Sequence, residues 1–261
     1  KHHERHGTHR NRRRYLMLNT KYVSDIAQKA MPHIEPKTHS EMLRHDVAGL
    51  LSGENNVGIE LGVAEGVFSK RMVESNKFRR FYAVDLYGDT HDTAEYIRAL
   101  KHIGIDEDVH KLLRVDFDSA LELFPDNFFD FIYIDGYAHT GEEGGTTLIK
   151  WFPKLRAGGI FAGDDYHNDW PLVKWAVNDF VCKTQSQLYL TGQNEDTKWC
   201  QYPTWYLYKS AQIGEISVNN KLYSIAMRER ERIHAARTKK NRSWKNKIRR
   251  IASRARKKWK E

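Results

Sequence analysis

The residues best suited to chemistry in this sequence are acids and glycines that follow short apolar segments. They are Glu60, Gly62, Asp85, Asp116, Asp135-Gly136 and Asp164-Asp165. Carboxylates can hold hydroxyl, ammonium or metal groups, and glycines let a backbone approach a ligand closely. If the apolar segments are neighbouring strands, these residues converge on one ligand site.

The elements that must position these residues alternate between strand and helix. The apolar segments predict strands over 57–61, 81–86, 112–115, 129–134 and 159–163. Segments 187–191 and 204–208 predict two closing strands, and we expect a helix capped by Thr38 or Ser40 that runs to Leu51. Strands that alternate with helices form a parallel sheet covered on both faces, whose ligands lie beyond the carboxyl ends of the strands.

The first strand leads into a glycine-containing turn. Glu60, directly before this turn, would repel the pyrophosphate of a dinucleotide but attract the ammonium group of a methionine moiety. Asp85 follows 25 residues later, where an acid can accept hydrogen bonds from both hydroxyls of a ribose. Purely structural roles stay open, because such turns often only pack and Asp85 could cap a helix. The signs of the charges favour S-adenosylmethionine over NAD.

The combined motifs resemble those of class I S-adenosylmethionine-dependent methyltransferases. More narrowly, they resemble the metal-assisted small-molecule O-methyltransferases of the macrocin and catechol types. The motifs are Glu60-x-Gly62-x-x-x-Gly66-x-x-Ser69, Asp85, Tyr133-Ile-Asp135-Gly136 and Gly158-Gly-Ile-Phe-Ala-Gly-Asp164-Asp165-Tyr166. The resemblance covers about residues 38–210. It implies an α/β fold with a doubly wound, mostly parallel, seven-stranded sheet and one antiparallel strand near its edge.

The resemblance also implies roles for individual residues around the methyl donor. The residues that would hold its methionine part are Glu60, Gly62 and Gly66. Asp85 would hold the ribose, and the region of Asp116 would flank the adenine.

A divalent metal site is a further implication of the resemblance. The matching ligands are Asp135 after the fourth strand and the pair Asp164 and Asp165 after the fifth. Such a hard oxygen site suits Mg²⁺, which would chelate the acceptor and lower the pKa of its hydroxyl. The alternative is that the acid pair only caps the following helix.

Aromatic residues and histidines surround these acids in the sequence. His139 lies four residues after Asp135, where many relatives have a histidine after three, and it is the candidate general base. A structural loop histidine is the alternative, and His167 is a weaker candidate. Four tryptophans either line a substrate pocket or pack in the core: Trp170, Trp175, Trp199 and Trp205.

The charge is distributed unevenly along the chain. Residues 1–14 carry a net charge of +5 and residues 228–261 carry +13, so the remainder carries −9. In the basic C-terminal tail, Trp244, Ile248 and Ile251 recur at helical spacing. This pattern predicts an amphipathic basic helix for an anionic membrane surface or a nucleic acid. A solvated or disordered tail, or one that docks on the acidic body, is the alternative.

The sequence therefore divides into a basic N-terminal arm and lead-in (1–37), a methyltransferase domain (38–210), and a linker with the basic tail (211–261). Two cysteines without metal-like spacing and the lack of a long apolar run favour a soluble cytoplasmic protein. We expect O-methylation of a small-molecule hydroxyl, on a sugar or a phenol, with metal assistance. The alternatives are an RNA-directed methyltransferase that uses the tail, and a noncatalytic binding module that retains the fold.

Overall fold

The computed structural model describes residues 19–258, apart from 89–90, 106–107, 195, 198 and 212–215. Side chains are described up to residue 239. The predicted N-terminal arm over residues 1–14, and Trp259 of the tail, lie outside the described residues.

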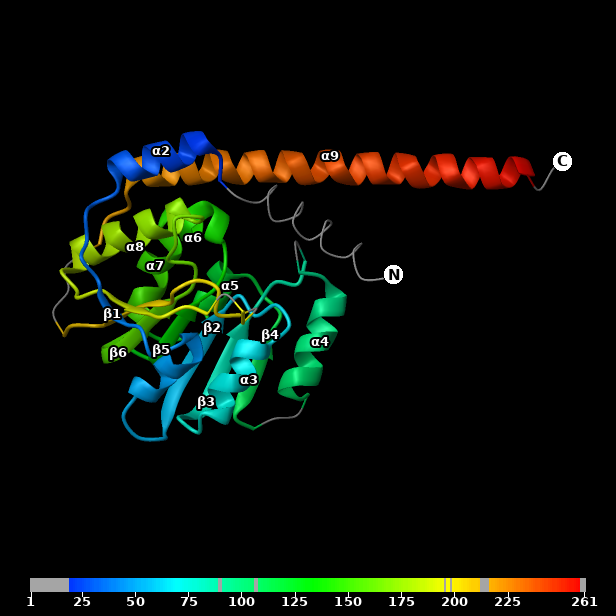
Figure 1. Ribbon diagram of the computed structural model, residues 1–261. Coiled ribbons are helices and arrows are strands. Elements are labelled where there is room, and N and C mark those ends of the chain that lie inside the picture. The colour runs from blue at the N-terminus through cyan, green and yellow to red at the C-terminus, as the bar shows by residue number, and fades with distance from the viewer. Residues whose placement is uncertain are drawn as a thin grey trace.

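Eight strands of the described chain form one sheet (Figure 1). They are β1 (Lys37–His39), β2 (Asn56–Leu61), β3 (Phe78–Val84), β4 (His110–Leu113), β5 (Phe129–Ile134), β6 (Leu155–Gly163), β7 (Tyr189–Thr191) and β8 (Trp205–Tyr208). Their order is β1-β7-β8-β6-β5-β2-β3-β4, and only β8 runs antiparallel to its neighbours. Because the strand order reverses beside β2, the carboxyl ends of β2, β3 and β5 border the place where such sheets bind ligands.

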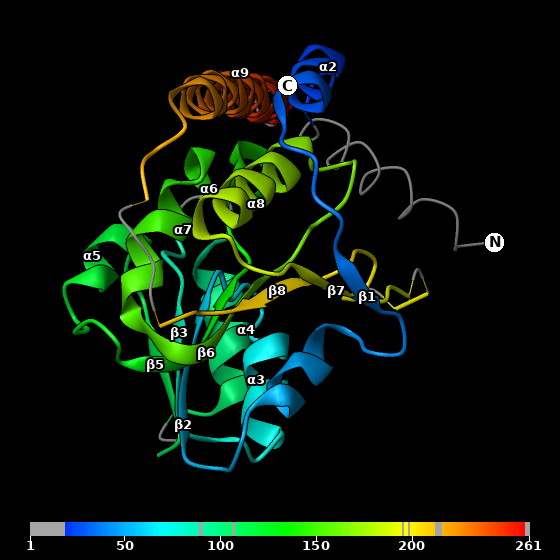
Figure 2. The same cartoon turned by 90° about the vertical axis from the view of Figure 1, so that its left-hand side faces the viewer.

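Helices cover both faces of this sheet (Figure 2). They are α2 (Lys21–Ala30), η1 (Arg44–Leu50), α3 (Val67–Glu74), α4 (Thr93–Ile103), α5 (Phe117–Leu121), η2 (Ala138–Thr140), α6 (Gly141–Gly144), α7 (Thr146–Trp151), η3 (Phe152–Lys154), α8 (Pro171–Thr184) and α9 (Asn220–Lys258). Helices α3 and α4 lie on one face, and α7 and α8 lie on the other. Figure 2 shows α2 and α9 side by side outside α8, as a further layer.

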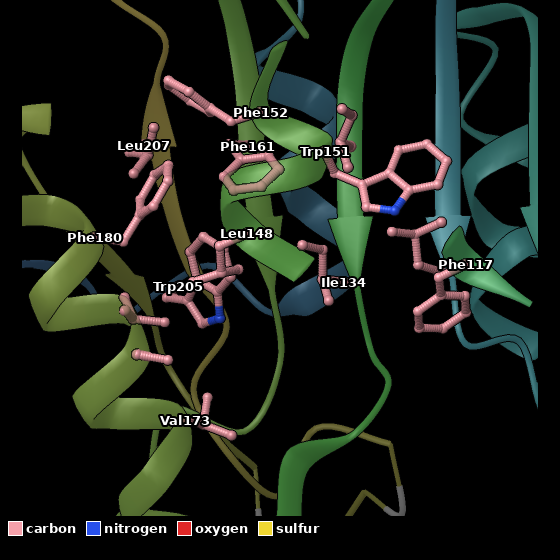
Figure 3. Packing of buried hydrophobic residues seen from close by; sticks show 14 of the residues in the cluster. Phe117, Ile134, Leu148, Trp151, Phe152, Phe161, Val173, Phe180, Trp205 and Leu207 are labelled. Atoms are coloured by element: carbon pink, nitrogen blue, oxygen red, sulfur yellow. The ribbon is translucent and has the colours of Figure 1, made fainter. Parts of the chain in front are cut away.

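The core follows from the alternation of side chains along the buried strands. On β5, Ile132 and Ile134 belong to the large apolar cluster under α7 and α8, whereas Phe131 and Tyr133 belong to the cluster under η1 and α3. Figure 3 shows the large cluster, in which Trp151 and Trp205 are fully buried. A strand with both faces covered needs this nearly continuous apolar sequence.

The predicted fold class is confirmed, with two corrections to its details. The sheet has eight strands in the described chain rather than seven, because Lys37–His39 pairs with Tyr189–Thr191 as β1. The helix expected from Thr38 or Ser40 to Leu51 is wrong. Thr38 lies in β1, and the segment beyond it forms the shorter 3₁₀ helix η1, where Asp46 accepts a hydrogen bond from the backbone N–H of Leu43 at 2.8 Å.

Two segments outside residues 38–210 pack on the same body. Val23 and Ala27 of α2, and Leu222 and Ala226 of α9, are buried. The domain division stays a prediction, but these helices cover α8 and α6. No helix in the described part of the chain has the length and apolar character of a membrane span.

Candidate active site

The turn after β2 has the backbone shape that its glycines require. Gly62 has φ +96°, and a side chain there would collide with the carbonyl of Asp135. Gly66 has φ +78° and lies against Ile103 of α4. Ala64, where nucleotide-binding turns often carry glycine, also has a positive φ of 48°. The turn therefore brings bare backbone to the carboxyl edge of the sheet.

Asp85 holds this turn in place. Its Oδ2 accepts hydrogen bonds from the backbone N–H groups of Val63 and Ala64 at 3.0 and 3.1 Å, and its Oδ1 accepts one from Tyr87 at 3.0 Å. The side chain is buried. The predicted contact with a ribose stays a prediction, because the structure gives Asp85 three backbone partners and a place at the cavity wall.

A cavity of about 190 Å³ opens above the glycine turn, and we call it the donor cavity. Its walls include Gly62, Asp85 and Asp116, so three of the five residues predicted around the methyl donor do converge. Asp116 caps α5 and accepts hydrogen bonds from the backbone and hydroxyl of Ser119 at 2.9 and 2.7 Å. These bonds lower the pKa of Asp116. These hydrogen bonds show that Asp116 caps the helix, and its predicted position beside the adenine stays a prediction.

Glu60 lies beneath the turn with 1% of its surface exposed. The Ser69 hydroxyl donates a short hydrogen bond to its carboxylate. Burial raises the pKa of Glu60 well above its ordinary value, and the Ser69 bond only partly opposes this shift. Glu60 and Ala64 border a smaller cavity of about 60 Å³ beside Arg44. A cationic ligand in this cavity would stabilise the ionised form of Glu60.

Arg44 is the central cation of the site, and the sequence analysis missed it. Its guanidinium donates to Asp135 at 2.7 Å and forms an ion pair with Asp164 at 2.9 Å. Only 6% of the side chain is exposed, and the guanidinium stacks over Phe68 and Tyr133. Burial opposes the charge, but the two carboxylates more than offset it and keep the pKa of Arg44 above its ordinary value. Arg44 thus joins η1 to the ends of β5 and β6.

The predicted metal site does not form among the described residues. They contain no group of three or more histidine, cysteine or acidic side chains that could hold a metal. The physical reason is that Asp135 and Asp164 direct their oxygens at Arg44, which already supplies the positive charge. Asp165 has a left-handed φ of 63°, so its backbone differs from that of Asp164. The residues present do not fit a Mg²⁺ site.

Asp164 is poised between two opposing influences. Burial raises its pKa to about 7, although the neighbouring Arg44 lowers it. Thr204 contacts its Oδ1 at 3.4 Å, and the Thr204 hydroxyl also meets Tyr133 at 2.9 Å. A carboxyl group with such a pKa exchanges its proton near neutral pH.

A second hollow of about 330 Å³ adjoins the donor cavity, and we call it the acceptor cleft. It shares Gly62, His91, Asp135 and Trp170 with the donor cavity. The remaining lining residues are Arg44, Ala64, Asp164, Asp165, Trp199, Gln201 and Tyr202. The four tryptophans therefore divide: Trp170 and Trp199 line the cleft, whereas Trp175 and Trp205 are core residues.

The two histidine candidates lie apart from the paired acids. His139 borders the donor cavity rather than the acceptor cleft, and its carbonyl accepts a hydrogen bond from Asn19 at 2.9 Å. His167 stacks on Tyr202 with ring centroids 4.8 Å apart, beside the cleft. Another histidine, His91, borders both hollows and pairs with Glu95 at 2.7 Å. The role of His139 as a base stays a prediction.

A strained segment follows His139 in the chain. Residues 141–145 all have left-handed φ values, including Glu142 at 54° and Glu143 at 50°. A side chain at Gly141 would collide with Leu172 of α8, and one at Gly144 would collide with Tyr223 of α9. Such strain persists only where packing enforces it, and it concentrates at functional sites.

Glu142 is the second residue that the sequence analysis did not assign to the site. It is 1% exposed, and its Oε2 has no hydrogen-bond partner among the described residues. Burial, followed by the charge of Asp165, raises its pKa well above the ordinary value. For Arg44 a signal existed, because Arg44, Val47 and Ala48 share one side of their helix. For Glu142 only the flanking glycines gave a hint.

Comparison with known proteins agrees with this geometry. A family described as a methyltransferase domain matches residues 59–166. Spermidine synthase from Thermotoga maritima superposes with a TM-score of 0.51 and 15% identity, covering 72% of this chain and 71% of that one. An rRNA methylase from Streptococcus thermophilus superposes with a TM-score of 0.44 and 16% identity, covering 64% of this chain and 93% of that one. No curated protein matches the sequence significantly.

The match spans the glycine turn, Asp85, Asp135 and the acid pair, which are among the residues that border the two hollows. Residues 59–166 therefore match a methyltransferase domain, and they lie on a Rossmann-like sheet. The protein is a methyltransferase enzyme.

Proposed function

We propose that the protein methylates a hydroxyl group of a small ring-shaped acceptor, a sugar or a phenol, in the acceptor cleft. The observation that carries this proposal is the position of the cleft, which shares Gly62 and Asp135 with the donor cavity. Aromatic side chains of Trp170, Trp199 and Tyr202 suit the face of a ring. Asp164 and Asp165 offer oxygens that can accept hydrogen bonds from hydroxyls.

The donor side of the proposal rests on charge. S-adenosylmethionine supplies the methyl group, whose bond to sulfur breaks as the bond to the acceptor oxygen forms. Glu60 and Asp135 border the small cavity under the turn. The positive charge of the ammonium and sulfonium groups of this donor would stabilise the ionised form of Glu60 and attract Asp135. Asp85 keeps the turn in the shape that admits it.

The acceptor hydroxyl must lose its proton during transfer. Asp164 borders the acceptor cleft and is the group we assign to receive this proton. Arg44 fixes the carboxylate and lowers its pKa against the effect of burial, so that the ionised form is populated at neutral pH. His139, from the donor cavity, is the alternative base. No step of this scheme uses a metal, since Arg44 fills that place.

The test measures S-adenosylhomocysteine formation with panels of saccharides, phenols and RNA as acceptors. We expect transfer to a member of the first two panels, with Asp164→Asn lowering kcat by at least a hundredfold and leaving donor affinity within threefold. Asp126→Asn, an exposed acid remote from the cleft, is the matched control.

Each other outcome overturns a defined part of the proposal. Loss of activity in His139→Gln together with an active Asp164→Asn would move the base to the histidine. Transfer to RNA without transfer to any small molecule would refute the acceptor class. A folded enzyme that binds the donor but methylates no hydroxyl would refute O-methylation.

A further inference from the structure

Helix α9 extends far beyond the body on which it begins. Its first turns pack against α6 and α8, and Ile233 is the last buried residue among the side chains described, which end at residue 239. Figure 1 shows the helix continuing past the sheet and its covering helices. We call residues 234–258 the arm. At 1.5 Å per residue, these 25 residues span about 38 Å.

The arm differs sharply in charge from the docked part of the same helix. Residues 220–233 carry four basic and two acidic residues, and described ion pairs join Arg232 to Glu229 and Arg230 to Glu143. The arm carries twelve lysines and arginines and no acid. Like charges three or four residues apart destabilise a helix, and no acid within the arm can compensate. An external polyanion would relieve this repulsion.

The distribution of basic positions favours a nucleic acid over a membrane surface. A helix that lies in a membrane interface needs a broad apolar face. The large apolar residues of the arm are few: Trp244, Ile248 and Ile251. At about 100° per residue, Lys240 and Lys247 fall on the same side of the helix as Trp244 and Ile251. The basic positions therefore surround the helix, as a binding partner with phosphates on several sides requires.

The charge of the rest of the chain indicates that the arm would bind a polyanion without help from the catalytic body. Residues 15–227 carry a net charge of −9, so the catalytic body repels a polyanion. The arm leads away from that body as one continuous helix. A rod of this length can follow a nucleic acid groove over about one helical turn of the duplex.

We propose that the arm of α9 binds the phosphate backbone of a nucleic acid without sequence preference. This inference is independent of the acceptor in the proposed function. Lysine and arginine side chains would displace counterions from the phosphates, so the affinity must fall steeply with salt. The interaction would hold the enzyme on nucleic acid whichever molecule it methylates.

The experiment uses the full chain and a fluorescein-labelled 24-base-pair duplex, as DNA and as RNA, in anisotropy titrations from 50 to 200 mM salt. With six or more phosphate contacts, the affinity should fall about a thousandfold or more over this range. The arm variant replaces four cations by glutamine, which preserves helix propensity: Arg249, Arg250, Arg254 and Arg256. It should bind at least tenfold more weakly at 100 mM salt and, if all four cations contact phosphates, lower the salt slope by about 3.6.

A matched variant separates the arm from net charge. It replaces four exposed cations of the body by glutamine: Lys21, Lys29, Arg79 and Lys101. We expect this variant to bind within twofold of the unmodified chain. Equal losses in both variants would refute the assignment to the arm. Tighter, arm-dependent binding to vesicles of phosphatidylserine and phosphatidylcholine than to either duplex would refute the nucleic acid and make the arm a membrane anchor.

Discussion

Replacing Arg44 by methionine tests the electrostatic centre of the site. Methionine keeps most of the apolar volume between Phe68 and Tyr133 but removes both carboxylate contacts. Removing one partner of a buried ion pair typically lowers the free energy of unfolding by about 3–5 kcal/mol, because it leaves an uncompensated buried charge. Asp164 is 12% exposed, so water can relieve little of that charge. We expect the free energy of unfolding to fall by about this amount above pH 8.

The loss should depend on pH in a defined direction. The folded-state pKa of Asp164 is about 7, which is above its unfolded value of 3.8, so the folded protein binds the extra proton. Its contribution to stability is therefore present at low pH and is lost as pH rises toward 7. Without Arg44 the pKa of Asp164 rises further, and this loss extends to higher pH. The effect of Arg44→Met should thus be smaller at pH 5.5 than at pH 8.5.

The assay is guanidinium unfolding followed by tryptophan fluorescence at these two pH values. Arg71→Met is the matched control, since Arg71 is an exposed arginine at the same small cavity and should change stability by less than about 0.5 kcal/mol. A double-mutant cycle with Asp164→Asn completes the test. We expect a coupling of at least about 1 kcal/mol, because the second substitution removes the charge that the first leaves unpaired. Simple additivity, or a loss equal to that of the control, would refute the buried ion pair.

Three further outcomes follow from the site. Asp85→Asn should weaken S-adenosylmethionine binding by about tenfold to a hundredfold in calorimetry, because asparagine cannot accept all three backbone hydrogen bonds; unchanged affinity in a folded variant would contradict this role. Methyl transfer should persist in excess chelator, because Arg44 occupies the place predicted for a metal; activity that disappears and returns with Mg²⁺ would restore the metal. Donor binding should release protons and become tighter as pH rises, because the cationic donor lowers the raised pKa of Glu60. Calorimetry in phosphate and Tris buffers would detect the released protons as a buffer-dependent heat of binding, and Glu60→Gln should abolish this buffer dependence.

The strands were predictable where burial leaves a strong signature. Phe129–Ile134 has the bounds expected from its apolar sequence. β1 was not predictable, because Lys37–His39 is polar and owes its extended form to pairing with β7. The segment before β2 shows the limit of periodicity, since apolar spacing of three and four fits both an α-helix and the 3₁₀ helix η1.

Convergence of the acids was predictable in the same way, because the ends of neighbouring parallel strands meet at one edge. The partner that each acid binds could not be predicted from the sequence. Asp85 received two of its three backbone partners from a turn more than 20 residues earlier, and this depends on the exact path of that turn. The packing of α9 against Gly144 likewise depends on a contact between segments far apart in sequence.

The acid motifs predicted a cation at the ends of β5 and β6, and the structure supplies one of another kind. Carboxylates that approach each other in a buried place require positive charge, and a metal ion or a guanidinium can provide it. The choice is made by a residue outside the motifs, since Arg44 lies 91 residues before Asp135 in the sequence. A guanidinium donates hydrogen bonds through its N–H groups but has no open coordination position. Unlike a metal ion, it therefore cannot bind an acceptor oxygen as a ligand. If Arg44 stays in place during catalysis, the acceptor must be oriented by the cleft walls and deprotonated by a side chain, which is why Asp164 and His139 become the residues to compare.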